Sequence, residues 1–218
     1  MVAYREGIGD ILAEGTYRAA FKIAEMKGMK PEELLKYAVH VKGIEIGAHG
    51  TRSDKDYTHD ISYAASVQGG DHTSIAVDGY NDMSGAVFYD SAVFCTFTAR
   101  GPSQALIFDF AKAITGYPIT LHSWRSIIGP RIVTLQKALL LMSNMWEPIK
   151  DDDNPPRFYE PLPSGPYKGK TTDRERVDIR LQAYFDTLGW DERGIPKKET
   201  LDRLDLGDVN QYMAKYRQ

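Results

Sequence analysis

Apolar residues recur at roughly helical intervals along most of the chain, and glycine and proline divide these stretches into short segments. Between Asp10 and Lys27 the spacing predicts one helix, with Asp10 suited to the N-cap and Gly28 to a left-handed C-cap. Pro31 suits the first position of a further helix, where its missing N–H leaves no bond unmade. Strand-like patterns are sparse, so the sequence predicts a mainly α fold.

The same signals set the expected element boundaries. A brief extended segment is expected at residues 39–41, followed by a glycine-rich, charged loop at 43–60. Residues 83–99 favour a buried helix, although their aromatic and β-branched content also allows a strand. The predicted helices span residues 10–27, 31–37, 61–67, 83–99, 102–116, 120–146 (interrupted near 129–130), 172–188, 197–204 and 208–218.

Residues 151–166 differ in composition from the segments on either side. Three consecutive aspartates, Asp151, Asp152 and Asp153, are followed by five prolines. Closely spaced prolines are typical of loops and linkers, because proline cannot continue a helix. We therefore expect a proline-rich linker near 151–166, with the aspartate run in solvent.

Composition excludes several classes of function. The net charge of −3 gives no electrostatic reason to expect nucleic acid or an anionic membrane as a partner. The longest uncharged run, residues 113–124, is too short to span a bilayer, and no secretory leader is evident. The single cysteine, Cys95, excludes an internal disulfide framework. A cytoplasmic protein is the expectation.

Two glycine-bearing loops contain histidines, His49 in AHGTR and His72 in QGGDHT. Histidine titrates near neutral pH, so either could act as an acid, a base or a hydrogen-bond donor. A surface or capping role is favoured for His40, His59 and His122. The histidines lack the spacing of a zinc site, and neither a phosphate-binding glycine motif nor a nucleophile elbow is present.

Asp90 and Cys95 form a third candidate feature, in the segment DSAVFC. Five residues turn an α-helix by roughly 500°, so the two side chains would not share a helical face. They either serve different neighbours or the segment is a turn. The simpler alternative is a buried structural cysteine beside a capping aspartate.

Six segments together have a specific order and spacing. They are residues 5–15 (REGIGDILAEG), 41–46 (VKGIEI), 63–72 (YAASVQGGDH), 129–132 (GPRI), 165–169 (GPYKG) and 188–196 (LGWDERGIP). In this order they resemble the C-terminal region of the aldehyde ferredoxin oxidoreductase family, tungsten enzymes with a bis-pterin cofactor and a four-iron cluster. The resemblance implies helical domains that correspond to the end of domain 2 and to domain 3. Residues 1–60 would be the remainder of a middle domain, and 61–218 the C-terminal helical domain.

The resemblance also implies roles for individual residues. The family motif D-x-x-G-L-C binds pterin through its aspartate and following backbone, and its cysteine ligates the [4Fe–4S] cluster. Asp90 and Cys95 keep that spacing, whereas Val93 and Phe94 replace the glycine and the leucine. Asp90 and Phe94 are thus expected at the pterin, and Cys95 is expected as one thiolate of the cluster.

The resemblance also implies roles for residues in the two histidine-containing loops. His72 falls at the position of a family histidine that approaches the metal. His49 stands where many members have a tyrosine, and Arg52 keeps an arginine expected to contact the cofactor. With histidine in place of this tyrosine, the chain resembles the branch of the family that is related to the tungsten benzoyl-CoA reductase catalytic subunit.

The resemblance implies an enzyme that is incomplete without an N-terminal part or subunit, which would supply the other three cysteines. The expected activity exchanges electrons between an aldehyde/carboxylate couple and ferredoxin, at tungsten or molybdenum. One alternative is a benzoyl-CoA-reductase-like acyl-CoA reductase. Another, from a different class, is a non-catalytic helical assembly domain. A small-molecule substrate is expected, and neither nucleic acid nor membrane is expected as a partner.

Overall fold

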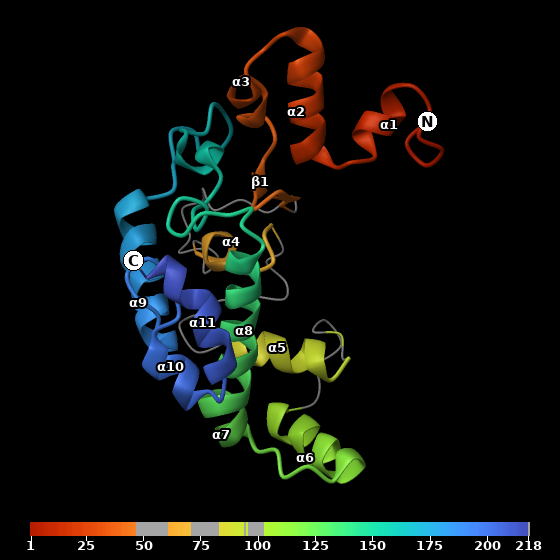
Figure 1. Cartoon of the computed structure of the whole chain (residues 1–218). Coiled ribbons are helices and arrows are strands. Elements are labelled where there is room, and N and C mark those ends of the chain that lie inside the picture. The colour runs from red at the N-terminus through yellow and green to blue at the C-terminus, as the bar shows by residue number, and fades with distance from the viewer. Residues whose placement is uncertain (47–60, 71–82, 94, 96–102, 218) are drawn as a thin grey trace. The chain divides into compact units, whose positions relative to one another are not determined.

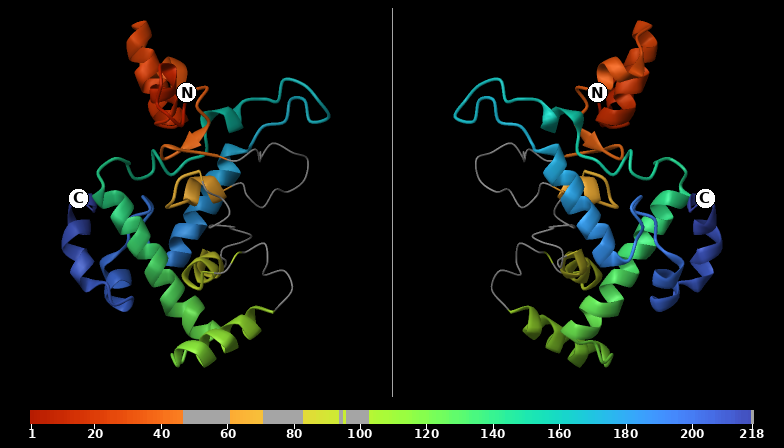
Figure 2. Two further views of the ribbon diagram at one scale, coloured as in Figure 1. Left: turned by 90° about the vertical axis from the view of Figure 1, so that its right-hand side faces the viewer. Right: turned by 90° about the vertical axis from the view of Figure 1, so that its left-hand side faces the viewer.

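The computed structural model describes residues 1–46, 61–70, 83–93, 95 and 103–217. These residues are mainly helical, and the strands among them form one short antiparallel hairpin, which confirms the predicted class (Figures 1 and 2). Two compact units are present: Met1–His72 with Lys150–Leu181, and Thr73–Ile149 with Gln182–Gln218. The two units group residues by their contacts and do not correspond to the predicted domains, residues 1–60 and 61–218. The predicted domain boundary near residue 60 therefore stays a prediction.

The first unit contains the N-terminal helices, the hairpin and the proline-rich segment. Its elements are α1 (Ile8–Leu12), α2 (Thr16–Lys27), α3 (Pro31–Leu35), β1 (His40–Val41), β2 (Ile44–Glu45), α4 (Ser62–Ala65), the 3₁₀ helix η2 (Pro156–Tyr159) and the beginning of α9 (Arg174–Leu188). Its core includes the buried side chains of Val41, Tyr63 and Phe158. The rings of Tyr63 and Phe158 meet edge to face, with centroids 5.7 Å apart.

The single helix predicted over 10–27 is wrong. The chain forms α1 and α2, which are separated at Gly15, whose φ of 84° lies in the left-handed region. Asp10 is inside α1 rather than its N-cap, and its carboxylate accepts a hydrogen bond from Arg5 Nε at 2.7 Å. The predicted left-handed cap at Gly28 is confirmed, with φ of 63°.

The β1–β2 hairpin packs closely against the glycines that follow α4. A Cβ added to Gly69 would lie 2.7 Å from the carbonyl oxygen of Val41. At Gly70 an added Cβ would overlap the carbonyl oxygens of Ile44 and Glu45. Glycine is required here because the two backbones approach too closely for any side chain. The helix predicted over 61–67 is shorter than expected: only α4, a single turn, forms, and it ends before the glycines that contact the hairpin.

The second unit is built around the long helix α8. Its elements are α5 (Met83–Ser91), α6 (Gln104–Thr115), α7 (Leu121–Ser123), the π-helical turn η1 (Trp124–Ile128), α8 (Gly129–Met142), the end of α9, α10 (Lys198–Arg203), the 3₁₀ helix η3 (Gly207–Val209), α11 (Asn210–Met213) and the 3₁₀ helix η4 (Ala214–Tyr216). Both α5 and α11 contact α8.

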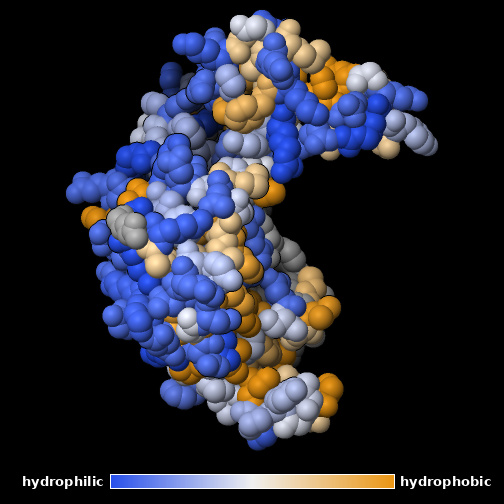
Figure 3. All heavy atoms as spheres, viewed as in Figure 1, coloured by the Kyte–Doolittle hydropathy of each residue, from blue (hydrophilic) through white to orange (hydrophobic). Residues whose placement is uncertain are grey.

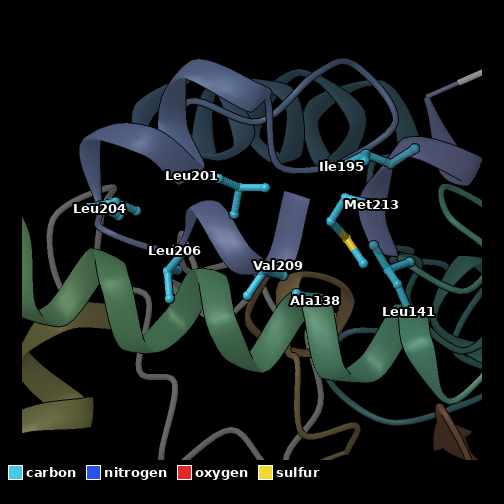
Figure 4. Packing of buried hydrophobic residues seen from close by; sticks show 8 residues of the cluster. All are labelled: Ala138, Leu141, Ile195, Leu201, Leu204, Leu206, Val209 and Met213. Carbon is cyan, nitrogen blue, oxygen red and sulfur yellow. The ribbon is translucent and has the colours of Figure 1, made fainter. Parts of the chain in front are cut away.

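Buried apolar side chains join α8 to the C-terminal elements, as Figure 4 shows. The cluster comprises Ala138, Leu141, Ile195, Leu201, Leu204, Leu206, Val209 and Met213. Beside it, the buried indole of Trp190 donates its N–H to the hydroxyl of Thr134 at 3.2 Å. A second contact joins α5 to α6, where the rings of Phe88 and Phe108 stack at 4.0 Å.

The interruption predicted near Gly129 is a change of helix type rather than a break. Thr120 caps α7, accepting the backbone N–H of Ser123 at 3.0 Å, and the chain continues through the π turn into α8. Pro130 has no N–H to bond the carbonyl four residues earlier, at Ser126. Arg203 donates to that carbonyl instead, at 3.4 Å.

Gly70→Ala is expected to lower the free energy of unfolding by about 1–3 kcal/mol, because the carbonyl oxygens that a methyl group would meet belong to the backbone. The matched control is Gly207→Ala, where an added Cβ meets only Asp202 Oδ1, at 3.7 Å. Denaturant unfolding of both variants measures the difference. Equal stability of the two variants would contradict the close packing at Gly70.

Candidate functional site

The candidate cofactor segment begins in the last turn of α5. Asp90 is exposed there, and the helix ends at Ser91 rather than continuing to residue 99 as predicted. The N–H of Val93 donates to the carbonyl of Asp90 at 3.1 Å and closes a turn. Cys95 follows and is exposed, so the alternative of a buried structural cysteine is wrong. Asp90 and Cys95 thus lie on either side of a turn.

Val93 occupies the position at which the family motif has glycine. Its φ is 55°, a left-handed conformation that is strained for a β-branched residue, and the residue is 93% exposed. Glycine adopts this conformation without penalty. The backbone therefore keeps the path that a glycine would favour, although the residue has changed.

The chemistry of the exposed groups fits the implied cofactors. A carboxylate such as that of Asp90 accepts hydrogen bonds of the kind that pterin N–H groups donate. An accessible cysteine thiolate, such as Cys95 can provide, is the usual ligand of a four-iron cluster, which needs four ligands. The described residues contain no group of three or more metal-ligating side chains. The chain has one cysteine, so the remaining ligands of such a cluster would have to come from elsewhere.

Four predicted site residues, His49, Arg52, His72 and Phe94, lie outside the described residues. So does His59. The other two histidines have the predicted surface and capping roles. His122 is exposed, and Nδ1 of His40 accepts the N–H of Gly43 at 3.3 Å.

A buried ion pair that sequence reasoning missed lies near the start of the proline-rich segment. Lys42 Nζ is 3.1 Å from Asp152 Oδ1, and each side chain is 2% exposed. Lys42 Nζ also donates to the carbonyl of Ala64 in α4 at 3.1 Å. The expectation that the aspartate run is in solvent is therefore wrong for Asp152. The run of three acidic residues concealed this, because its sequence pattern is that of a solvated linker.

Asp153 also has specific partners. One carboxylate oxygen accepts the hydroxyl of Tyr159 at 2.5 Å, and the other accepts Arg174 at 3.0 Å. The Arg174 guanidinium lies 3.8 Å from the centre of the Tyr159 ring. Burial and the hydrogen bond to Asp153 raise the pKa of Tyr159, so the phenol stays protonated and continues to donate. The segment near 151–159 is thus attached to the first unit.

Glu45 in β2 connects the hairpin to α2. Its carboxylate accepts the backbone N–H of Thr16, one of the N–H groups left free at the start of that helix. Burial alone would raise the pKa of Glu45, but backbone hydrogen bonds, including that from Thr16, lower it overall. Burial lowers the pKa of the neighbouring His40 and outweighs the opposing charges of Glu45 and Asp151.

These contacts connect three of the motif segments. Glu45, in residues 41–46, bonds the N–H that follows residues 5–15, and Lys42 bonds a carbonyl within residues 63–72. The same short hairpin packs on the two glycines before His72. Three of the six motif segments therefore lie in contact with one another within the first unit.

Comparison with known proteins identifies the family. The family described as "Aldehyde ferredoxin oxidoreductase, domains 2 & 3" matches residues 1–206, and the chain belongs to it. It is 52% identical, over 99% of its length, to the "Aliphatic sulfonate oxidoreductase, WOR-like subunit" of Pyrococcus furiosus. It is 32% and 30% identical, over 95% of its length, to tungsten-containing aldehyde ferredoxin oxidoreductases of Pyrococcus furiosus and Thermococcus kodakarensis.

The chain covers only 35–36% of the length of these three relatives. It corresponds to the C-terminal helical region of a tungsten oxidoreductase, as the resemblance implied. Among the residues that the structure describes, every helix is too short or too polar to serve as a membrane span.

Val93→Gly is expected to be neutral or to stabilise the protein by up to about 1.5 kcal/mol. Release from the left-handed strain, roughly 1–2 kcal/mol, is partly offset by the greater chain entropy of unfolded glycine, roughly 0.5–1 kcal/mol. The exposed valine loses little packing. Val93→Ala, which keeps a Cβ, is the matched control. The thermal midpoint of Val93→Gly should equal or exceed those of the valine and alanine proteins, and a glycine variant less stable than the valine protein contradicts the backbone assignment.

Proposed function

We propose that this chain provides one wall of a tungsten–pterin active site, in an oxidoreductase whose other ligands come from a further polypeptide segment or subunit. The observation that carries the proposal is the 52% identity along 99% of the chain to a subunit of an oxidoreductase. The exposed carboxylate of Asp90 and the exposed Cys95, at the spacing of the family motif, support it.

Asp90 would accept hydrogen bonds from the pterin ring, and the backbone at Phe94 would lie against the same group. Arg52 would bind an anionic part of the cofactor or the substrate, since its guanidinium can donate two parallel hydrogen bonds to an oxyanion. Cys95 would supply one thiolate of a [4Fe–4S] cluster. When bound, the tungsten–pterin group supplies the two-electron redox chemistry.

His72 and His49 would handle protons beside the reacting carbon. Oxidative cleavage of an alkanesulfonate consumes one water and gives an aldehyde, hydrogensulfite, two protons and two electrons. Oxidation of an aldehyde to its carboxylate consumes one water and releases three protons and two electrons, so a nearby base is needed for either substrate. An imidazole that titrates near neutral pH can accept one of these protons and release it to solvent. The electrons would leave through the cluster to ferredoxin or another iron–sulfur protein.

We infer that the substrate class is an aliphatic sulfonate, on the strength of the 52% identical relative that is named for one. Aldehydes are the second candidate, because the relatives named for them are 30–32% identical. An aromatic acyl-CoA ester is the third, motivated by His49 in place of the tyrosine. A sulfonate carries a fixed negative charge, which suits an arginine such as Arg52.

Exposed apolar side chains on α6 are further evidence for the proposal that this chain is part of a larger assembly. Leu106, Phe110 and Ile114 recur four residues apart and are 44%, 58% and 82% exposed. Apolar side chains are visible at the α6 end of the face in Figure 3. Exposed apolar stripes of this kind commonly mark protein interfaces. Such a stripe also suits the second candidate, a non-catalytic assembly domain, which the departures at Val93 and Phe94 favour.

The substrate proposal is tested with the chain together with the polypeptide that corresponds to the part of these relatives that it does not cover. The purified complex should contain tungsten or molybdenum and should reduce a viologen dye with a short alkanesulfonate. Parallel assays use an aldehyde with the oxidised dye, and an aromatic acyl-CoA ester with the reduced dye, because the ester would accept electrons. Metal and dye reduction with the aldehyde alone would overturn the sulfonate assignment. A complex without either metal would favour the assembly domain.

The cofactor roles are tested by Cys95→Ala and Asp90→Asn in the same complex. Cys95→Ala is expected to lower iron content and to alter or abolish the electron paramagnetic resonance of the reduced cluster. Asp90→Asn is expected to lower pterin content, because the amide loses the charge that strengthens the hydrogen bonds. The matched control is Asp109→Asn, an exposed aspartate on α6. Wild-type cluster and pterin content in both variants would refute these roles.

A further inference from the structure

Lys42 places a positive charge in the interior of the first unit. Its side chain is 2% exposed, and its ammonium group contacts Asp152 and the carbonyl of Ala64, each at 3.1 Å. Removing an ammonium group from water is strongly unfavourable unless the group is paired and hydrogen-bonded. Both requirements are met here by residues that lie far apart in the sequence.

The carbonyl that Lys42 contacts belongs to a completely enclosed segment. Residues 61–67 have relative exposures of 0–7%, and Tyr63 within them is in the core of the unit. The short helix α4 has few hydrogen bonds of its own; the N–H of Ala65 donates to Ile61 at 2.8 Å, and that of Ser66 to Tyr63 at 3.2 Å. So short a helix depends on contacts from elsewhere in the protein for its position.

The same segment runs directly into the second histidine loop. Gly69 and Gly70 pack against the backbone of the hairpin that carries Lys42, and His72 is the second residue after Gly70 in the sequence. The hairpin therefore holds this segment at two places. Its lysine bonds Ala64, and its backbone contacts the two glycines.

Stability alone does not account for a charged pair at this place. Replacing a buried ion pair with apolar residues of similar volume is often neutral or stabilising. An apolar pair would fill the same space, but it would make no directional bond to the Ala64 carbonyl. The ammonium group provides that bond, and the Asp152 carboxylate balances its charge.

We propose that Lys42 is a positioning residue: its ammonium group, neutralised by Asp152, fixes the carbonyl of Ala64 and thereby the segment 61–70 that leads to His72. The effect on catalysis rests on the proposed function of His72. The effect on the segment itself does not depend on that function.

The test uses the assembled enzyme with the double variant Lys42→Met and Asp152→Leu, which replaces the pair with apolar side chains. A purely structural pair predicts that the double variant regains thermal stability and every other property. The positioning role predicts that amide hydrogen exchange in the peptide 61–70 stays faster by about tenfold or more, even when thermal stability is regained. It also predicts a fall in kcat of about tenfold or more, with KM nearly unchanged.

Two controls make the result specific. Exchange in α8 should be unchanged, and the double variant Lys198→Met and Asp202→Leu, which removes an exposed ion pair with the same chemistry, should leave segment 61–70 unaffected. Wild-type exchange in 61–70 together with wild-type kcat in the Lys42 and Asp152 double variant would overturn the proposal. If the wild-type complex has no activity, the proposed function fails, whereas the exchange experiment still decides whether Lys42 holds the segment.

Asp152→Asn provides a second variant should the double variant not fold. The asparagine keeps the shape of the site, and the lysine can still donate to the carbonyl of Ala64. Thermal stability is expected to fall while exchange in 61–70 stays within about twofold of the wild type, since the bond to the carbonyl remains. Exchange that rises equally in 61–70 and in α2 would show a general loss of structure and would overturn the positioning role.

Discussion

The ion pair between Lys42 and Asp152 is the contact on which much of the first unit depends. It connects the hairpin, α4 and the start of the proline-rich segment, three regions that are widely separated in the sequence. Each partner would be strongly unfavourable in the interior without the other. The pair therefore couples these regions, because none of them can move far without leaving a charge buried and unpaired.

The end of α5 shows how a backbone conformation can persist when its preferred residue has changed. Val93 has the left-handed conformation for which glycine is suited, in a turn closed by its own hydrogen bond to Asp90. The strain is small compared with the contacts that hold the preceding helix, including the stack of Phe88 on Phe108. A turn whose conformation glycine would favour can thus tolerate a valine.

The sequence predicted the helical class and many helix ends correctly, because capping and apolar spacing are local properties. Gly28 and Gly116 both have the left-handed conformation expected of a helix end, and Thr120 caps its helix. Local signals failed where tertiary contacts decided the outcome. The predicted first helix is divided at Gly15, where Glu45 from the hairpin bonds the start of α2. Of the predicted site, Asp90 and Cys95 are accessible, as their proposed roles require, while the other residues lie outside the described ranges.

By itself the sequence determined the class of fold, the family and the single cysteine that a cluster could use. These follow from residue identities and from the order of the motifs. Only the tertiary structure decided that Asp152 is buried against Lys42 rather than solvated. The environment of a charged side chain depends on what packs around it, and its partner here is 110 positions away in the chain. Burial of a charge is a property of the assembled fold, which a run of three aspartates does not reveal.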